Sequence, residues 1–290
     1  MASSFTRGCC LNAVNDPVVF KTPSWFYFVL AFFIAWAFWM VPLLGSRDVI
    51  AVPASVQTLF LVIGAFGPFF AAFISRYRDG GWAAVRSFAL RAFRYRIGPR
   101  YLMAALFLVP LLGLVAAWIY AQQGGPVLAL AVPPAQILIL LPLLFLVGGS
   151  MNEEFGWAYA IDRLQQRYRL LPAAVILGVI WGFWHLPLFF IVGATQSFMP
   201  FWAFVMFTVG ARVLFVWAYK GTGKSILTTL LFHTTTNLTL NLFVLVDRSP
   251  LRNERGFIAF AGLMLGTAVV VALASRRYRH ALQPVADHLV

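Results

Sequence analysis

Five polar residues in the second half of the chain have types and spacing that suit acid–base chemistry. They are two adjacent acids, two histidines and an asparagine: Glu153, Glu154, His185, His233 and Asn237. Such residues are scarce here, because 290 residues contain only nine Asp and Glu and four His. Carboxylates and imidazoles are the usual general acids and bases of enzymes near neutral pH. The set therefore predicts one catalytic site if the fold gathers its members.

The elements that must position these residues are long apolar segments. Hydrophobic residues make up 61% of the chain and charged residues 11%, which is more apolar surface than a soluble fold of this size buries. A helix needs about 20 apolar residues to cross ~30 Å of hydrocarbon. We therefore expect an all-α, polytopic transmembrane bundle of about eight helices, forming a single membrane domain over residues 1–290. Single helices are expected at 25–44, 52–74, 226–246 and 257–274. Two more are expected between 100 and 153, and another two from 170 onward, where residues 193–200 separate them.

The distribution of Lys and Arg predicts the orientation, because cytoplasmic loops retain positive charge. With both termini in the cytoplasm, 17 of the 22 Lys and Arg residues lie on that side. They are Arg7, Lys21, the seven arginines from 76 to 100, Arg163, Arg167, Arg169, Lys220, Lys224, Arg276, Arg277 and Arg279. Outside lie Arg47, Arg248, Arg252 and Arg255. The net charge of +13 thus indicates topology and contact with membrane lipids, not nucleic-acid binding, and we expect a multi-pass protein of the plasma (inner) membrane.

Ionisable side chains at membrane depth cost several kcal/mol unless they are paired or hydrated, so they usually face a bundle interior or a water-filled cavity. Glu153 and Glu154 are expected at the end of the fourth helix. His233 and Asn237 are four residues apart and share one face of the seventh. We expect all five polar residues to line one cavity. His185 lies far along the fifth helix, so this arrangement requires a kink at the following proline or a later helix start.

Structural interpretations of the same residues stay open. Asn237 could form a helix-to-helix hydrogen bond, and the acidic pair could be an interfacial partner of Arg163 and Arg167. Trp181 is expected to be a packing or interface aromatic. Arg212, inside the sixth helix, either neutralises an acidic group in the cavity or extends toward the interface.

Three segments in order resemble the CPBP family of intramembrane endopeptidases, which contains the CAAX prenyl proteases and lysostaphin-resistance-type proteins. They are Asn152-Glu-Glu-Phe-Gly-Trp157, Trp181-Gly-Phe-Trp-His-Leu-Pro-Leu188 and Phe232-His-Thr-Thr-Thr-Asn237. The resemblance covers about residues 152–240, within a predicted protease-like core at 130–245. The expected helix count and the basic loop after the second helix are also similar to the family.

The resemblance implies an endopeptidase in which Glu153 deprotonates a water that His185 holds. His233 and Asn237 would donate hydrogen bonds to the oxyanion, and Glu154 would orient its neighbours. It implies no cofactor and a peptide or lipopeptide substrate, small or prenylated, that enters from the membrane or the cytoplasmic side. Zinc held by Glu153, His185 and His233 is the alternative, since two histidines and a glutamate form catalytic zinc sites.

One departure from the family pattern affects the acidic pair. The family motif continues with an arginine at the position that Ala158 occupies here. Arg163 or Arg212 could replace it. Without a replacement, the chain could be a noncatalytic immunity or regulatory membrane protein.

A transporter is a third class of function, but the sequence shows no pair of similar halves. The sequence predicts no oligomeric state.

Overall fold

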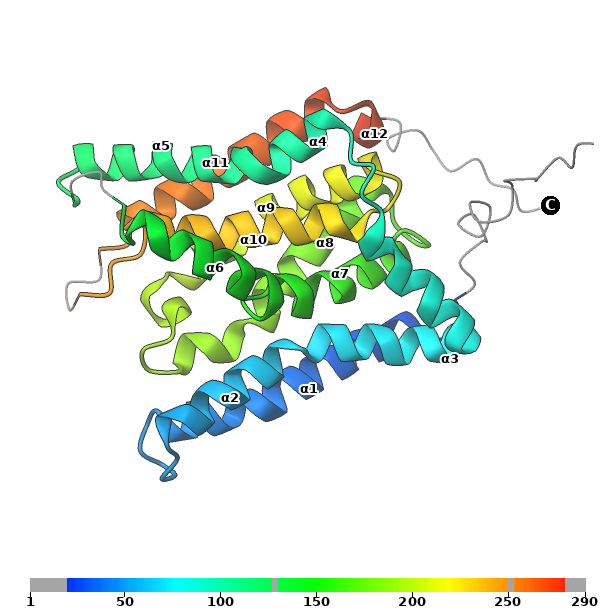
Figure 1. Ribbon diagram of the computed structural model, residues 1–290, viewed down its shortest axis with the longest axis horizontal. Helices are drawn as coiled ribbons and strands as arrows, with labels where there is room; N and C mark the ends of the chain where they lie inside the picture. Colours follow the sequence, from blue (N-terminus) through cyan, green and yellow to red (C-terminus); the bar gives the residue numbers. More distant parts are fainter. Residues whose placement is uncertain (1–19, 127–129, 250–252, 280–290) are drawn as a thin grey trace, which may run out of the picture.

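The structure, a computed structural model, describes residues 20–126, 130–249 and 253–279 as a bundle of helices (Figure 1). Within these ranges the only extended pairing is an isolated antiparallel bridge between Leu130 and Phe243, which confirms the all-α prediction. The predicted location of the two termini concerns residues outside these ranges and stays a prediction. The α-helices are α1 (Ser24–Gly45), α2 (Ala54–Ala65), α3 (Gly67–Ala89), α4 (Pro99–Met103), α5 (Val109–Gln122), α6 (Pro134–Leu146), α7 (Ser150–Leu164), α8 (Leu170–Trp184), α9 (Phe201–Gly221), α10 (Ile226–Leu242), α11 (Arg255–Ala274) and α12 (Arg276–Arg279).

Short turns of other helix types join or extend these helices. They are η1 (Leu90–Phe93), η2 (Ala104–Leu108), η3 (Leu186–Phe190) and η4 (Thr195–Phe198). η2 is a single π-helical turn between α4 and α5, so the three form one continuous span. η3 and η4 lie in the connection from α8 to α9.

Seven described helical segments are long and apolar enough to cross a membrane: Ser24–Gly45, Ala54–Phe93, Pro99–Gln122, Pro134–Leu164, Leu170–Phe190, Phe201–Gly221 and Arg255–Ala274. The seventh predicted helix, at 226–246, corresponds to α10, which has 17 residues and packs against α5, α6, α7 and α9. Large apolar side chains such as Phe33, Leu138 and Leu273 are at least 70% exposed, as expected for helix faces that contact lipid. The chain is a polytopic helical membrane protein.

The expected fourth helix is broken into α6 and α7 at Gly148 and Gly149. Gly149 has φ 116°, a conformation that residues with a side chain rarely adopt. Glu153 therefore lies in the first turn of α7 and Glu154 follows it directly, so the prediction that the pair lies at or near the end of the fourth helix is wrong. At 1.5 Å per residue, Glu153 lies about 16 Å from the far end of α7 at Leu164. The acidic pair therefore lies well inside the candidate membrane span Pro134–Leu164, at about half the ~30 Å thickness of a hydrocarbon core from that end of the span.

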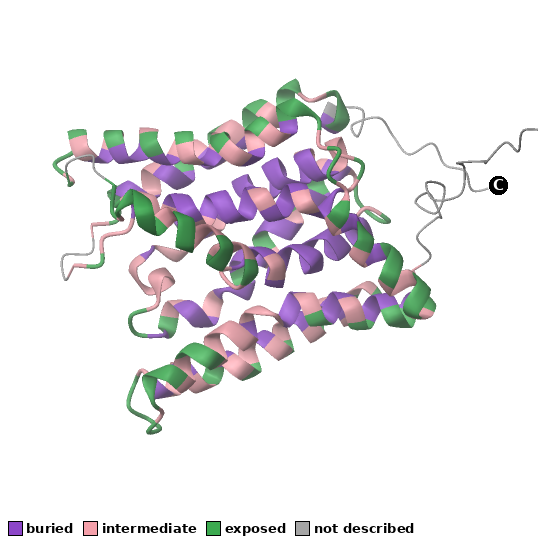
Figure 2. Ribbon diagram, in the orientation of Figure 1, coloured by how far each residue is buried: buried purple, intermediate pink, exposed green. Residues whose placement is uncertain are grey.

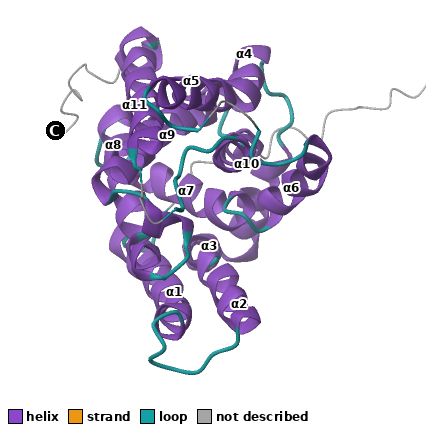
Figure 3. Ribbon diagram, turned by 90° about the vertical axis from the view of Figure 1, so that its left-hand side faces the viewer, coloured by secondary structure: helices purple, strands orange, loops and turns teal. Residues whose placement is uncertain are grey.

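The helix α7 is the central element of the bundle. It packs against α1, α3, α6, α8 and α10, and every residue except Met151 is buried. Figure 2 shows this burial on α7, α9 and α10, in contrast to the exposed surface of α6. Viewed from one end of the bundle, α7 lies inside the surrounding helices (Figure 3). Its polar residues therefore face protein instead of lipid, which is the arrangement that charged groups at this depth require.

A buried cluster around Asp162 joins several helix ends at one face of the bundle. The Asp162 carboxylate accepts hydrogen bonds from Arg91 at 2.7 Å, Lys220 at 2.8 Å and Tyr219 at 3.2 Å, and Lys224 Nζ lies 3.3 Å away. These partners come from η1, from α9 and from the turn before α10. We call this group the Asp162 cluster and this end of the bundle the arginine-rich face.

Replacing Asp162 with asparagine should destabilise the protein, because it leaves buried cations without their counter-charge. Removing one partner of a buried ion pair costs about 3–5 kcal/mol, which corresponds to a fall in Tm of roughly 10 °C in a protein of this size. Thermal unfolding in detergent would measure it, with Glu254→Gln as the control because Glu254 is exposed. Equal Tm values for the two variants would contradict the role given to Asp162.

Candidate active site

A cavity of about 450 Å³ begins at the middle of the bundle and is lined by Glu153, His185, His233 and Asn237. These side chains come from the start of α7, the end of α8 and the middle of α10. The structure thus brings together four of the five residues that the sequence singled out. Glu154 does not line the cavity but lies directly behind it, fully buried.

The two oxygens of Glu153 have different surroundings. Oε2 accepts hydrogen bonds from the indole N–H groups of Trp181 at 2.6 Å and Trp157 at 3.1 Å. Oε1 lies near Gly149, together with one nitrogen of His233 and one of Asn237. A Cβ atom built on Gly149 would lie 3.1 Å from Glu153 Oε1, 2.7 Å from His233 Nε2 and 2.9 Å from Asn237 Nδ2. A carboxylate, an imidazole and an amide therefore converge on one point at the helix break.

The orientation of the His233 ring is set from behind the cavity. Its Nδ1 lies 2.8 Å from Glu154 Oε1, and a carboxylate can only accept, so Nδ1 carries a proton. Nε2 is then the nitrogen that faces Gly149. The Asn237 amide donates one N–H to the carbonyl of Gly148, which leaves its second N–H as a further donor near the same point.

The Glu154 carboxylate forms a buried bidentate ion pair with Arg212 of α9. The two hydrogen bonds from the guanidinium measure 3.0 and 2.5 Å, and both residues are at most 1% exposed. The guanidinium also lies 4.0 Å from the ring centre of Trp181, within the range of a cation–π interaction. Arg212 is therefore the partner of the acidic pair, whereas Arg163 donates to the carbonyl of Thr22.

The position of His185 resolves the difficulty that the sequence raised. α8 ends at Trp184, and Pro187 lies in the turn η3, so the chain leaves the helix axis just after His185. His185 Nδ1 lies 2.8 Å from the carbonyl of Trp181. A carbonyl only accepts, so Nδ1 carries the proton and Nε2 of the neutral ring is an acceptor.

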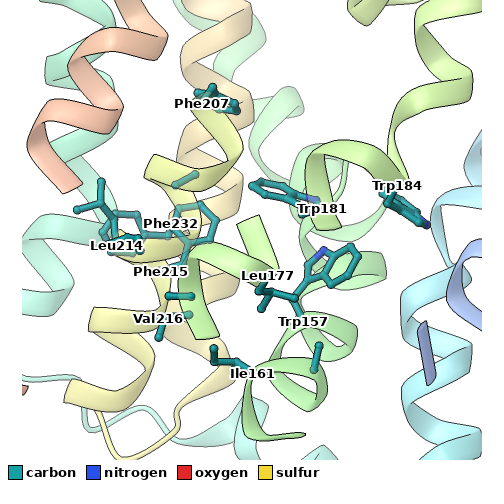
Figure 4. Packing of buried hydrophobic residues seen from close by; sticks show 14 of the residues in the cluster. Trp157, Ile161, Leu177, Trp181, Trp184, Phe207, Leu214, Phe215, Val216 and Phe232 are labelled. Atoms are coloured by element: carbon teal, nitrogen blue, oxygen red, sulfur yellow. The ribbon is translucent and has the colours of Figure 1, made fainter. Parts of the chain in front are cut away.

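The sequence assigned Trp181 to packing, but its indole is part of the site. Its N–H donates to Glu153, and its ring lies between the two histidines, with ring centres 5.6 Å from His185 and 5.5 Å from His233. Figure 4 shows Trp181 and Trp157 among the buried aromatic side chains around the site. The spacing of four residues between Trp181 and His185 was a usable signal, because it places both on one face of α8.

The zinc alternative does not match the arrangement of donors. Among residues 20–126, 130–249 and 253–279, no three His, Cys, Asp or Glu side chains are close enough together to hold a metal ion. Glu153 Oε2 is already bonded to two indole N–H groups. The ligand set Glu153, His185 and His233 therefore does not fit a metal site in this structure.

Two comparisons with known proteins concern this part of the chain. Residues 134–239 match the family described as type II CAAX prenyl endopeptidase Rce1-like. The CAAX prenyl protease 2 of Methanococcus maripaludis is 27% identical over 172 residues, which cover 57% of this chain and 60% of the relative. The chain thus spans about 60% of the length of this relative. All five polar residues singled out in the sequence lie within the matched family region.

Replacing Arg212 with methionine should lower the Tm more than Arg167→Met, because Arg167 is exposed and Arg212 neutralises a buried carboxylate. The expected cost is about 3–5 kcal/mol. Adding Ala158→Arg to Arg212→Met should recover part of the loss, since residue 158 lies one turn after Glu154 on α7. Thermal unfolding of the four proteins in detergent measures both effects. A double variant no more stable than Arg212→Met would argue that the geometry at Arg212 matters beyond its charge.

Proposed function

We propose that this chain, whose residues 134–239 match the family described as type II CAAX prenyl endopeptidase Rce1-like, hydrolyses peptide bonds in the cavity beside Gly149. The main support is the convergence of Glu153 Oε1, His233 Nε2 and Asn237 Nδ2 within about 3 Å of one point. A base and two hydrogen-bond donors around one reacting carbonyl are what amide hydrolysis requires. The roles of these residues are our proposal.

In the proposed reaction, Glu153 Oε1 takes a proton from a water molecule while the water oxygen attacks the scissile carbonyl carbon. His185 accepts a hydrogen bond from this water through Nε2. The resulting oxyanion is stabilised by N–H groups of His233 and Asn237. The carbon–nitrogen bond then breaks, and the proton on Glu153 moves to the leaving amine, so an acid and an amine are the products. The mechanism needs no covalent enzyme intermediate.

The charges of the site support donation by His233. Nδ1 is held by Glu154, so Nε2 can donate only if the ring is protonated at both nitrogens. Glu153 and Glu154 carry two negative charges, and Arg212 supplies one positive charge. The proposed donation therefore uses a doubly protonated His233, with which the charges of these four side chains sum to zero.

The cavity walls support a substrate with apolar parts. On one side the lining residues are Leu61, Val62 and Ala65 of α2 and Leu144 of α6. α6 has no buried residue, so it borders lipid on its outer side and the cavity on its inner side. Apolar cavity walls next to lipid suit a membrane-associated peptide or lipopeptide as substrate, including a prenylated one. The plasma membrane stays the expected location.

The noncatalytic alternative depended on Ala158 in place of the family arginine. A guanidinium nevertheless reaches the acidic pair, from Arg212 on another helix. The ion pair that would orient Glu154 and, through it, His233 is therefore present in another form. For this reason we favour the enzyme over an immunity or regulatory role.

Glu153→Gln should abolish peptide cleavage, because an amide cannot accept the proton of the attacking water. General base catalysis typically contributes at least about 100-fold, so kcat/KM should fall by that factor or more. The measurement uses quenched fluorescent peptides, prenylated and plain, with detergent-purified protein, and Glu254→Gln as the control. We expect chelators to leave cleavage unchanged. Sensitivity to a chelator would favour the metal alternative, and full activity of Glu153→Gln would exclude Glu153 as the base.

Gly149→Ala should also reduce cleavage strongly. The new Cβ would lie within 3.1 Å of three proposed catalytic atoms, and the φ of 116° is unfavourable for alanine. Displacements of about 1 Å can cost about 100-fold in rate. Gly262→Ala is the matched control, because a Cβ there meets no atom within 4 Å. The rates of the two variants on the best peptide substrate give the comparison, and near-equal rates would contradict the proposed geometry.

A further inference from the structure

The cavity opens at one particular end of the bundle. Its outer wall contains Thr195 and Gln196 from the connection between α8 and α9, and Arg248 from the segment after α10. Arg248 donates a hydrogen bond of 2.8 Å to the Thr195 hydroxyl, which joins the two segments. We call residues 193–196 and Arg248 the mouth.

The mouth lies at the end of the bundle where α1 ends and α2 begins. The backbone N–H of Val192 donates to the Ser46 hydroxyl at 3.1 Å, and Arg47 donates to the carbonyl of Phe190 at 3.0 Å. On the same side Arg255, at the start of α11, donates to the carbonyl of Gln123 after α5. This mouth face is the left side of Figure 1 and the side that faces the viewer in Figure 3.

The opposite end is the arginine-rich face, on the right of Figure 1. Side-chain contacts tie its helix ends together: Arg163 donates to Thr22 before α1, and Arg277 donates to Lys220 at the end of α9. The described Lys and Arg residues at this end are Lys21, Arg76, Arg78, Arg86, Arg91, Arg94, Arg96, Arg100, Arg163, Arg167, Arg169, Lys220, Lys224, Arg276 and Arg277. Within the described ranges, the mouth face has Arg47, Arg248 and Arg255.

The path from the arginine-rich face to the catalytic group is filled by side chains. Trp157, Ile161, Phe215 and Phe232 are each at most 1% exposed, and they pack together beneath Trp181 (Figure 4). Beyond them lies the Asp162 cluster, whose ion pairs close the helix ends. A peptide therefore reaches the cavity from the mouth face or from the lipid beside it.

We propose that the mouth opens to the extracytoplasmic side, so the enzyme acts on peptide segments outside the cytoplasm. Cytoplasmic loops of membrane proteins are enriched in Lys and Arg, and the large excess at the other end assigns that end to the cytoplasm. The substrate is then an exported peptide, or the outer segment of a membrane protein, instead of a soluble cytoplasmic protein. This differs from the cytoplasmic entry that the sequence suggested. The choice of substrate rests on the proposed peptidase function, whereas the orientation does not.

Cysteine accessibility in intact cells tests the orientation. Cys9 and Cys10 are the two cysteines of the chain, and replacing both with serine gives the background. Single cysteines are then introduced as Val192→Cys, which is 64% exposed beside the mouth, and Tyr168→Cys, which is 45% exposed between α7 and α8. Neither change alters the charge pattern that sets topology. A third variant, Gln196→Cys, reports on the cavity wall itself.

A membrane-impermeant maleimide should label Val192→Cys and Gln196→Cys in intact cells, and label Tyr168→Cys only after permeabilisation. Labelling of Tyr168→Cys in intact cells, with Val192→Cys protected until permeabilisation, would overturn the proposal. Labelling of all three only after permeabilisation would overturn it as well. The labelling result does not depend on activity. An inactive protein with the expected labelling would contradict the proposed peptidase function and still support the proposed orientation.

Discussion

The buried ion pair between Glu154 and Arg212 is the interaction on which the site depends. An unpaired carboxylate at this depth would be costly in lipid or in a dry protein interior. The pair also connects α7 to α9, and Glu154 orients the His233 ring of α10 through its hydrogen bond with Nδ1. Trp181 completes the connection, because its ring contacts the guanidinium and its N–H holds Glu153. One charge pair therefore fixes residues from four helices.

The helix break at Gly148 and Gly149 is the second requirement. An unbroken helix in lipid satisfies its own backbone and leaves little room for a reacting peptide bond. At the break, the carbonyl of Gly148 accepts from Asn237, and the absence of a side chain on Gly149 leaves space next to three polar atoms. The same local feature thus ends α6, starts α7 and creates the proposed reaction site.

The two ends of the bundle differ in structure: one is closed, and the cavity opens at the other. The arginine-rich face is closed by the Asp162 cluster and by the aromatic packing beneath the site, and it carries most of the Lys and Arg residues of the described ranges. The mouth face is made of loops and shorter turns, and the cavity opens there. Buried ion pairs are therefore concentrated at one end of the bundle, and the opening of the cavity lies at the other.

The sequence by itself determined the helical membrane class, because long apolar runs have no other stable solution in lipid. It also selected the five polar residues, because acids and histidines are scarce in this chain and costly at membrane depth. Only the tertiary structure decided which arginine pairs with Glu154, since residues 58 positions apart meet through packing and not through helical periodicity. It also decided that Trp181 belongs to the site, that Glu154 lies behind the cavity, and at which end the cavity opens. These features depend on how α7, α8, α9 and α10 cross, and no local pattern encodes that.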